Sequence, residues 1–213
     1  MFAPDLLTVY LGAVLVLIVT PGPDTFFVAA NSAAYGARAG VLAALGVGFG
    51  CLLHIAMATI GISALIAASP WAFGVVKIAG AAYLAWLAFQ ALRDAWRGHA
   101  GGGAIDARPR STLDLFLRGA LTNALNPKVA MFFIAFLPQF VDPARGPVWS
   151  QLVVLGLIFN LPGTLWLAGL AMVGGRATAR LRAMPWVRRA LDAAVGVFFL
   201  GLAIHLARGQ ARA

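Results

Sequence analysis

The sequence contains no glutamate, one cysteine and three histidines in 213 residues. The lone thiol, Cys51, supports neither a disulfide framework nor a paired redox centre. Because no cluster of histidine, cysteine or acidic residues shows the spacing of a metal site, we expect neither a metal nor a cofactor. A nucleophile–base set and an aspartate-rich magnesium site are also missing, so we expect no enzymatic activity.

Charge is scarce as well. Charged residues make up 11% of the chain and hydrophobic residues 62%, and the mean hydropathy is +0.88. An ordinary globular domain is about half apolar and about a quarter charged. The excess predicts an all-α integral membrane protein surrounded by the lipid bilayer. The net charge of +9 comes from arginines between apolar runs, without an aromatic–basic recognition element, so we expect no nucleic-acid partner.

Six apolar segments are long enough to cross a hydrocarbon core of ~30 Å, which takes about 20 helical residues. They are residues 5–35, 39–68, 71–92, 113–141, 148–174 and 187–207. We therefore expect one transmembrane domain over 1–213, made of two inverted three-helix repeats. The first repeat covers about 1–97, the linker 98–112 and the second repeat about 113–213, and equivalent helices of the two repeats run in opposite directions.

Arginines in the short loops predict the orientation, because cytoplasmic loops carry an excess of positive charge. With both termini outside, most arginines fall on the inner side, whereas Arg145, Arg208 and Arg212 fall on the outer side. The inner set is Arg38, Arg93, Arg97, Arg108, Arg110, Arg118, Arg176, Arg180, Arg182, Arg188 and Arg189. We expect both termini to face the periplasm.

Proline-containing motifs interrupt the first and fourth apolar segments. They are Pro21-Gly22-Pro23-Asp24 and Asn126-Pro127-Lys128. A proline removes a helical donor and disrupts the backbone pairing around it. In lipid, unpaired backbone groups are tolerated only inside protein or beside a water-filled cavity. Breaks at matching places in two inverted halves are the best sequence pointer to a transporter's binding site.

Segments along nearly the whole chain resemble the LysE/RhtB family of amino-acid exporters. They are both proline motifs, the turn Gly36-Ala37-Arg38-Ala39-Gly40, the glycine-rich second apolar segment, and residues 126–133 and 136–140. The resemblance implies a bacterial inner-membrane protein that exports amino acids or close derivatives, driven by the proton gradient. The family contains lysine, arginine, threonine, homoserine and leucine exporters, so the resemblance does not name a substrate.

Asp24 and Lys128 are the main candidate site residues, because charges at membrane depth usually mark substrate pathways or proton relays. Asp24 would bind a substrate ammonium or carry a proton; alternatively, it caps the helix that begins at Thr25. Lys128 would bind a substrate carboxylate, helped by the half-helix N-terminus at Asn126 and Pro127. The competing interpretation is that Asp24 and Lys128 form a salt bridge with each other.

Four further polar residues lie in the apolar segments: Asn126, Asn123, Asn160 and His54. The asparagines would hydrogen-bond a substrate or join helices, and Asn160 precedes a lesser break at residues 162–163. His54 would relay a proton or make an interhelical hydrogen bond. Gly46 and Gly50 place two small residues on one helix face, which predicts close packing of a neighbouring helix.

The residues and the resemblance together favour proton-coupled, secondary-active export of an amino acid by alternating access. Export of another small solute or of a metal cation is an alternative, although no ligand cluster supports the metal. A passive channel is a third possibility, because a polar cavity does not distinguish a channel from a carrier. A homo-oligomer is compatible with the sequence.

Overall fold

A computed structural model describes residues 2, 4–69 and 111–173, with isolated positions between 71 and 96 and between 186 and 200. Within these ranges the regular structure is helical and contains no strand. The third and sixth predicted spans (71–92 and 187–207) and the linker at 98–112 lie largely outside the described residues. The six-span organisation and its two inverted repeats therefore stay a prediction.

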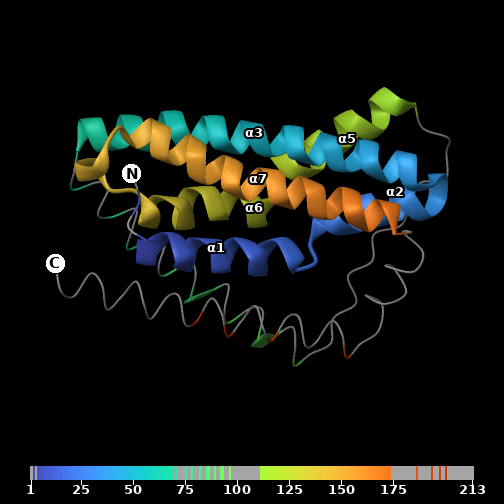
Figure 1. Ribbon diagram of the computed structural model, residues 1–213, viewed down its shortest axis with the longest axis horizontal. Helices are drawn as coiled ribbons and strands as arrows, with labels where there is room; N and C mark the ends of the chain where they lie inside the picture. Colours follow the sequence, from blue (N-terminus) through green and yellow to red (C-terminus); the bar gives the residue numbers. More distant parts are fainter. Residues whose placement is uncertain are drawn as a thin grey trace.

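The described helices follow the predicted apolar segments. They are α1 (Pro4–Val19), α2 (Pro23–Tyr35), α3 (Ala37–Ala68), α5 (Thr112–Ala124), α6 (Pro127–Met131), and α7 (Val148–Met172). After α6 the chain continues as a π-helical turn, η1 (Phe132–Phe136), and two 3₁₀ turns, η2 (Leu137–Phe140) and η3 (Pro143–Arg145). α3, α7 and α1 run along the long axis of the molecule, with α6 between α7 and α1 in the view of Figure 1.

The chain bends where the two proline motifs lie. Leu6–Val19 and α2 meet at 44°, and α5 and Pro127–Phe140 meet at 46°. Both helices that follow a bend carry proline at their start, where the missing N–H has no helical acceptor to bond. By length and composition α3 and α7 can each cross a membrane, and each bent pair can do so as one span, which makes up to four candidate spans.

The predicted lesser break in the fifth segment is wrong. α7 is continuous through Pro162 over 25 residues. Proline removes a single backbone donor, and the hydrogen bonds on both sides of it keep the helix together. Asn160 therefore lies on an uninterrupted helix.

Glycines bring α3 and α5 into direct backbone contact. A Cβ on Gly46 would overlap the carbonyl of Phe116, and a Cβ on Gly50 would overlap the carbonyl of Ala120. Gly119 on α5 faces the carbonyl of Ala43 in the same way. This confirms the close approach predicted from Gly46 and Gly50, and it fixes α5 against the first half of α3.

Aromatic side chains form a core between α1, the turns after α6, and α7. Tyr10 is fully buried and donates a hydrogen bond of 2.6 Å to the carbonyl of Leu155. Its ring packs on Phe136 and Phe140, at centroid distances of 6.1 and 5.1 Å. Phe132 stacks on Phe159 of α7 at 4.5 Å. This core holds the segment after the second bend against both α1 and α7.

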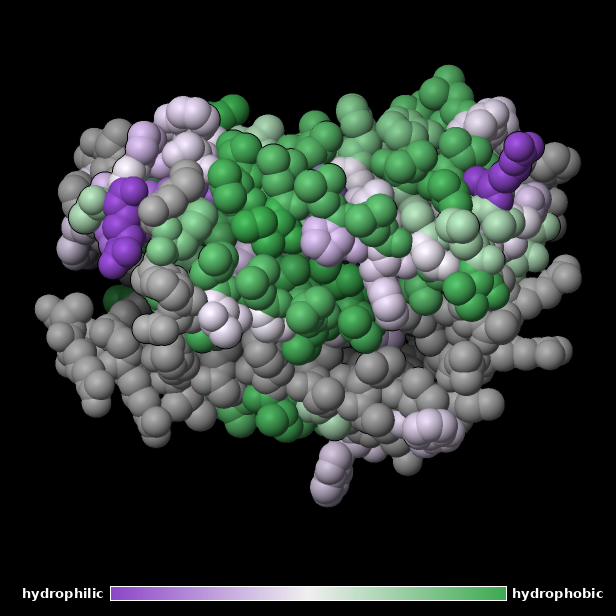
Figure 2. All heavy atoms as spheres, viewed as in Figure 1, coloured by the Kyte–Doolittle hydropathy of each residue, from purple (hydrophilic) through white to green (hydrophobic). Residues whose placement is uncertain are grey.

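Large apolar side chains also cover the surface of the helices. Ile60 and Leu165 are each 72% exposed. In Figure 2 hydrophobic residues fill most of the coloured surface between the ends of the molecule, and the most hydrophilic residues in view lie at the two ends. Such a broad apolar surface indicates contact with lipid.

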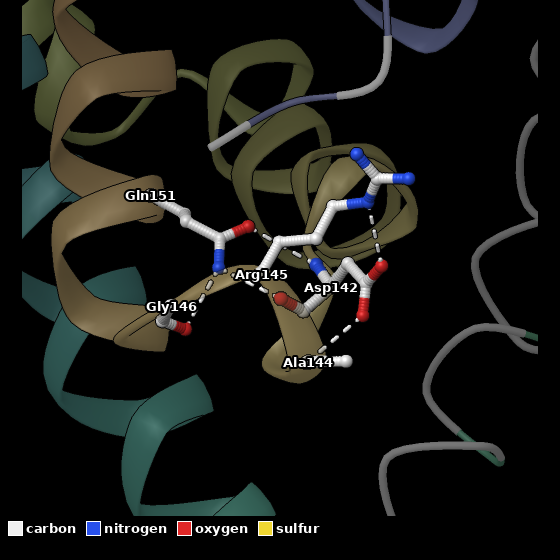
Figure 3. A network of polar contacts seen from close by, with 5 residues as sticks. All are labelled: Asp142, Ala144, Arg145, Gly146 and Gln151. Carbon is white, nitrogen blue, oxygen red and sulfur yellow. Dashed lines mark hydrogen bonds and ion pairs between the residues drawn. The ribbon is translucent and has the colours of Figure 1, made fainter.

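The side chain of one glutamine holds the segment before α7 in place by hydrogen bonds. Gln151 is fully buried, donates to the carbonyls of Asp142 (2.8 Å) and Gly146 (3.0 Å), and accepts from the Asp142 N–H (Figure 3). The Asp142 carboxylate in turn accepts from Ala144 N–H and pairs with Arg145 at 3.1 Å. The turn therefore reaches α7 with its buried polar groups paired.

Candidate functional site

Asp24 lies in the first turn of α2 and is half-buried. Its Oδ2 accepts hydrogen bonds from the side-chain amides of Asn123 (2.8 Å) and Asn126 (2.9 Å). The capping interpretation is wrong, because Gly22 is the N-cap of α2 and no side chain caps this helix. The carboxylate instead joins the first bend to the second.

Lys128 joins the two bends in the opposite direction. Its Nζ donates to the carbonyls of Leu17 (3.1 Å) and Thr20 (3.0 Å) at the end of α1. The helical donor for the Leu17 carbonyl would be residue 21, which is Pro21 and has no N–H. Lys128 thus replaces a backbone donor that the first motif lacks, and it brings a positive charge to the negative end of α1.

The start of α6 is capped from within the second motif. The Asn126 side-chain oxygen accepts from the Lys128 N–H at 3.0 Å, and Pro127 has no N–H to offer. The first two positions of this half-helix therefore present no available backbone donor to an anion. A substrate carboxylate would depend on the Lys128 side chain rather than on these positions.

His54 lies on α3 and is buried. Its Nε2 is 2.9 Å from the backbone carbonyl of Asn123, and because a carbonyl only accepts, Nε2 is the protonated nitrogen. The ring stacks on Phe133 at a centroid distance of 5.9 Å. His54 therefore makes the interhelical hydrogen bond that was one of its two predicted roles, and it fixes the end of α5.

Asn160 connects α7 to α3. Its side-chain amide donates to the carbonyl of Gly48 at 3.2 Å, and its oxygen accepts from the Thr164 hydroxyl at 3.2 Å. A Cβ on Gly48 would overlap that hydroxyl, so the glycine permits the close approach. Both polar atoms of the Asn160 amide are used by neighbouring helices.

A cavity of about 60 Å³ lies where these residues meet. This volume is enough for a few water molecules, because one water needs about 10–15 Å³ of such space. Predicted site residues on its wall are Gly22, Asp24, Asn123, Asn126, Lys128 and Asn160. The other lining residues are Leu17, Ile18, Thr20, Thr25, Val47, Cys51, Val129, Phe159, Gly163, Thr164 and Leu167. The lining does not include His54, Pro21, Pro23 or Pro127.

Sequence reasoning missed the three threonines of the lining. Thr20 directly precedes the first motif, Thr25 directly follows it, and Thr164 is one helical turn after Asn160. Adjacency to a proline break and the i, i+4 spacing were the signals that could have identified them. The described residues contain no group of three or more histidine, cysteine or acidic residues that could hold a metal.

The family of the chain follows from its similarity to known proteins. Residues 15–210 match the family model described as LysE type translocator. The chain belongs to this family. This confirms the resemblance drawn from the two proline motifs, and it makes the chain a membrane translocator.

Individual relatives of this LysE type translocator match along almost their whole length. A leucine efflux protein of Klebsiella pneumoniae is 32% identical over 205 residues, which cover 96% of this chain and 95% of the relative. A leucine efflux protein of Enterobacter is 30% identical, with 94% and 93% covered. An uncharacterized membrane protein of Pseudomonas aeruginosa is 35% identical, with 95% and 94% covered. No solved structure matches the chain.

Proposed function

We propose that this translocator exports neutral amino acids from the bacterial cytoplasm, with the cavity between the two bends as the binding site. The observation that carries the proposal is that the two motifs meet there. Asp24 from the first motif and Lys128 from the second line the same cavity. Membership of the LysE type translocators and similarity to two leucine efflux proteins support amino-acid transport.

The chemistry of the lining suits a zwitterion. A free amino acid carries one carboxylate and one ammonium, and the cavity offers one residue of each opposite charge. Its other walls include Leu17, Ile18 and Phe159, which suit an apolar side chain. A second positive charge on the substrate would find no second acidic group, because Asp24 is the only acidic residue of the described lining.

Proton coupling is part of the proposal. Asp24 is the group on the cavity wall that can exchange a proton for a substrate cation, and carboxylates at membrane depth often act as proton relays. We infer alternating access of two three-helix halves around the cavity, in the inner membrane, with both termini periplasmic. His54 is the alternative proton carrier, and its Nε2 is hydrogen-bonded to the Asn123 carbonyl.

Efflux from intact cells tests this function. Cells that express the protein are loaded with amino acids by dipeptide feeding, and the release of a panel of amino acids is followed with and without an uncoupler. We expect saturable, uncoupler-sensitive release of one or a few neutral amino acids beyond the vector control. Release that neither saturates nor responds to the uncoupler would indicate a channel instead, and release of no amino acid would contradict the proposal.

A further inference from the structure

Two buried oxygen atoms, on residues that line the cavity, have no hydrogen-bond partner among the described residues. They are Oδ1 of Asp24 and Oδ1 of Asn123. Both residues line the cavity, and they are joined to each other through Asn123 Nδ2 and Asp24 Oδ2 at 2.8 Å. Buried side-chain oxygens in native proteins nearly always have a donor, so each such exception calls for a physical reason.

The orientation of the Asn123 amide follows from its neighbour. A carboxylate can only accept, so the amide nitrogen must face Asp24, and the amide oxygen must point elsewhere. The backbone of Asn123 is equally constrained, because its carbonyl accepts from His54 Nε2 at 2.9 Å. The side chain is 2% exposed, so bulk solvent does not supply the missing donor.

We propose that Asp24 Oδ1 and Asn123 Oδ1 together form the ammonium subsite of the translocator, and that they select a primary amine. The inference rests on the proposed function and adds Asn123 as a direct ligand. An ammonium group has three N–H donors, which is enough to give one to each oxygen. The Asp24 charge provides attraction, and Asn123 provides the second, neutral acceptor.

The arrangement discriminates by the number of donors that the substrate carries. A dimethylated amino group retains one N–H, so one of the two buried oxygens must stay unpaired when it binds. Sites that hydrogen-bond a substrate N–H strongly reject analogues that lack it, because the buried partner is left without a donor. We expect N,N-dimethylation to weaken binding on the order of tenfold or more.

Asn126 provides a matched control. Asn123 and Asn126 donate similar hydrogen bonds to the same Asp24 oxygen, at 2.8 and 2.9 Å. Their amide oxygens differ: that of Asn126 accepts from Lys128 N–H, whereas that of Asn123 has no partner among the described residues. Serine at 126 keeps a capping oxygen for α6. Asn123→Ala and Asn126→Ser therefore both remove an amide donor to Asp24, and only the first removes the proposed ligand.

The experiment measures binding to purified protein in detergent by competition, with leucine, N-methyl-leucine and N,N-dimethyl-leucine as probes, and alanine with its methylated derivatives in parallel. We expect the wild type and Asn126→Ser to prefer the primary amine over the dimethyl form at least about tenfold. In Asn123→Ala the ratio should fall to within about twofold, because the second acceptor is gone.

Each alternative outcome has a separate meaning. Equal affinity of the wild type for leucine and its dimethyl form, with leucine transported, would overturn the subsite and leave the proposed function standing. An unchanged ratio in Asn123→Ala would overturn the role of Asn123. Failure of both amino acids to bind, together with absent efflux, would overturn the proposed function and the subsite with it.

Discussion

The two bends of this chain arise from the same chemistry but are stabilised differently. At the second bend, the N–H of Lys128 bonds the Asn126 side chain, and the carbonyl of Asn123, four residues before Pro127, accepts from the nearby Asn126 N–H and from the distant His54 Nε2. At the first bend, the carbonyls of Leu17 and Thr20 are satisfied by Lys128, 111 and 108 residues away. The carbonyl left without a helical donor by Pro127 thus has a local donor as well as a distant one, whereas the carbonyl left without a helical donor by Pro21 is bonded by the distant Lys128. The first bend therefore depends on the other half of the protein more than the second bend does.

Most of these contacts are donated by the second half of the chain to the first, and the bond from His54 to the Asn123 carbonyl is donated in the opposite direction. The second motif supplies Lys128 to the carbonyls of the first bend, and Asn126 to the Asp24 carboxylate. Asn123, just before the second motif, adds another donor to the same carboxylate. In a carrier, a conformational change that separates the two bends would expose these groups together, so the same contacts can hold the cavity closed. The following predictions test this asymmetry.

The largest effect is expected from Asp24→Asn. Asparagine cannot carry a proton or a negative charge, and hydrogen bonds to charged groups contribute ~1.5–3 kcal/mol each. Uncoupler-sensitive efflux should fall by at least about a hundredfold, which corresponds to ~2.7 kcal/mol, while membrane insertion is retained. The measurement is efflux per unit of membrane-inserted protein.

Asp114→Asn is the control for this change. Asp114 lies in the exposed first turn of α5, where it forms an i, i+4 pair with Arg118 at 2.8 Å. Efflux should stay near the wild-type rate there. Wild-type rates in Asp24→Asn would remove Asp24 from the pathway and leave it a purely structural role in holding Asn123 and Asn126.

The next effect is expected from Lys128→Met, because it leaves the carbonyls of Leu17 and Thr20 without this donor. A buried polar group that loses its partner costs ~1–3 kcal/mol, so the free energy of unfolding should fall by about 2 kcal/mol. Pro21→Ala restores a backbone N–H near the Leu17 carbonyl, and in the double variant it should recover part of the loss. Unfolding of the four proteins in detergent, treated as a double-mutant cycle, measures the coupling.

The same lysine decides between two interpretations of the charges. Because Asp24 and Lys128 have separate hydrogen-bond partners, Asp24→Ala/Lys128→Ala should lose at least as much stability and affinity as either single change. Recovery in the double variant would favour a mutual salt bridge. Lys128→Arg, which keeps the charge and the donors, should retain most of the stability.

Part of this site follows from local rules. Proline chemistry places helix breaks at residues 21–24 and 126–128, and helical spacing of Gly46 and Gly50 predicts a close helix contact. The contact between Lys128 and the Leu17 carbonyl could not be predicted. The missing N–H of Pro21 identifies the carbonyl that lacks a helical donor, but it does not identify the side chain that bonds this carbonyl. The side-chain amide that bonds Asp24 comes from a distant part of the chain, so the sequence alone left the capping interpretation of Asp24 open.

A smaller effect is expected from Asn126→Ala, which removes the local cap of the second bend and one donor to Asp24. Loss of an N-cap costs ~1 kcal/mol, and Asn126→Ser should recover most of that part. Thermal unfolding of the two variants separates the cap from the Asp24 contact, because serine keeps only the cap. Equal stability of the alanine and serine variants would show that capping does not stabilise this bend.

The smallest effect is expected from Pro127→Ala. The carbonyl four residues before Pro127, that of Asn123, already accepts from the Asn126 N–H and from His54 Nε2, so a new N–H at 127 meets no carbonyl that lacks a donor. The change in unfolding free energy should be within about 0.5 kcal/mol, chiefly through the entropy of the unfolded chain. Pro21→Ala differs, because its new N–H competes with Lys128 for the Leu17 carbonyl. In the wild-type background Pro21→Ala should therefore lower efflux more than Pro127→Ala does, and equal effects of the two substitutions would contradict the asymmetry of the bends.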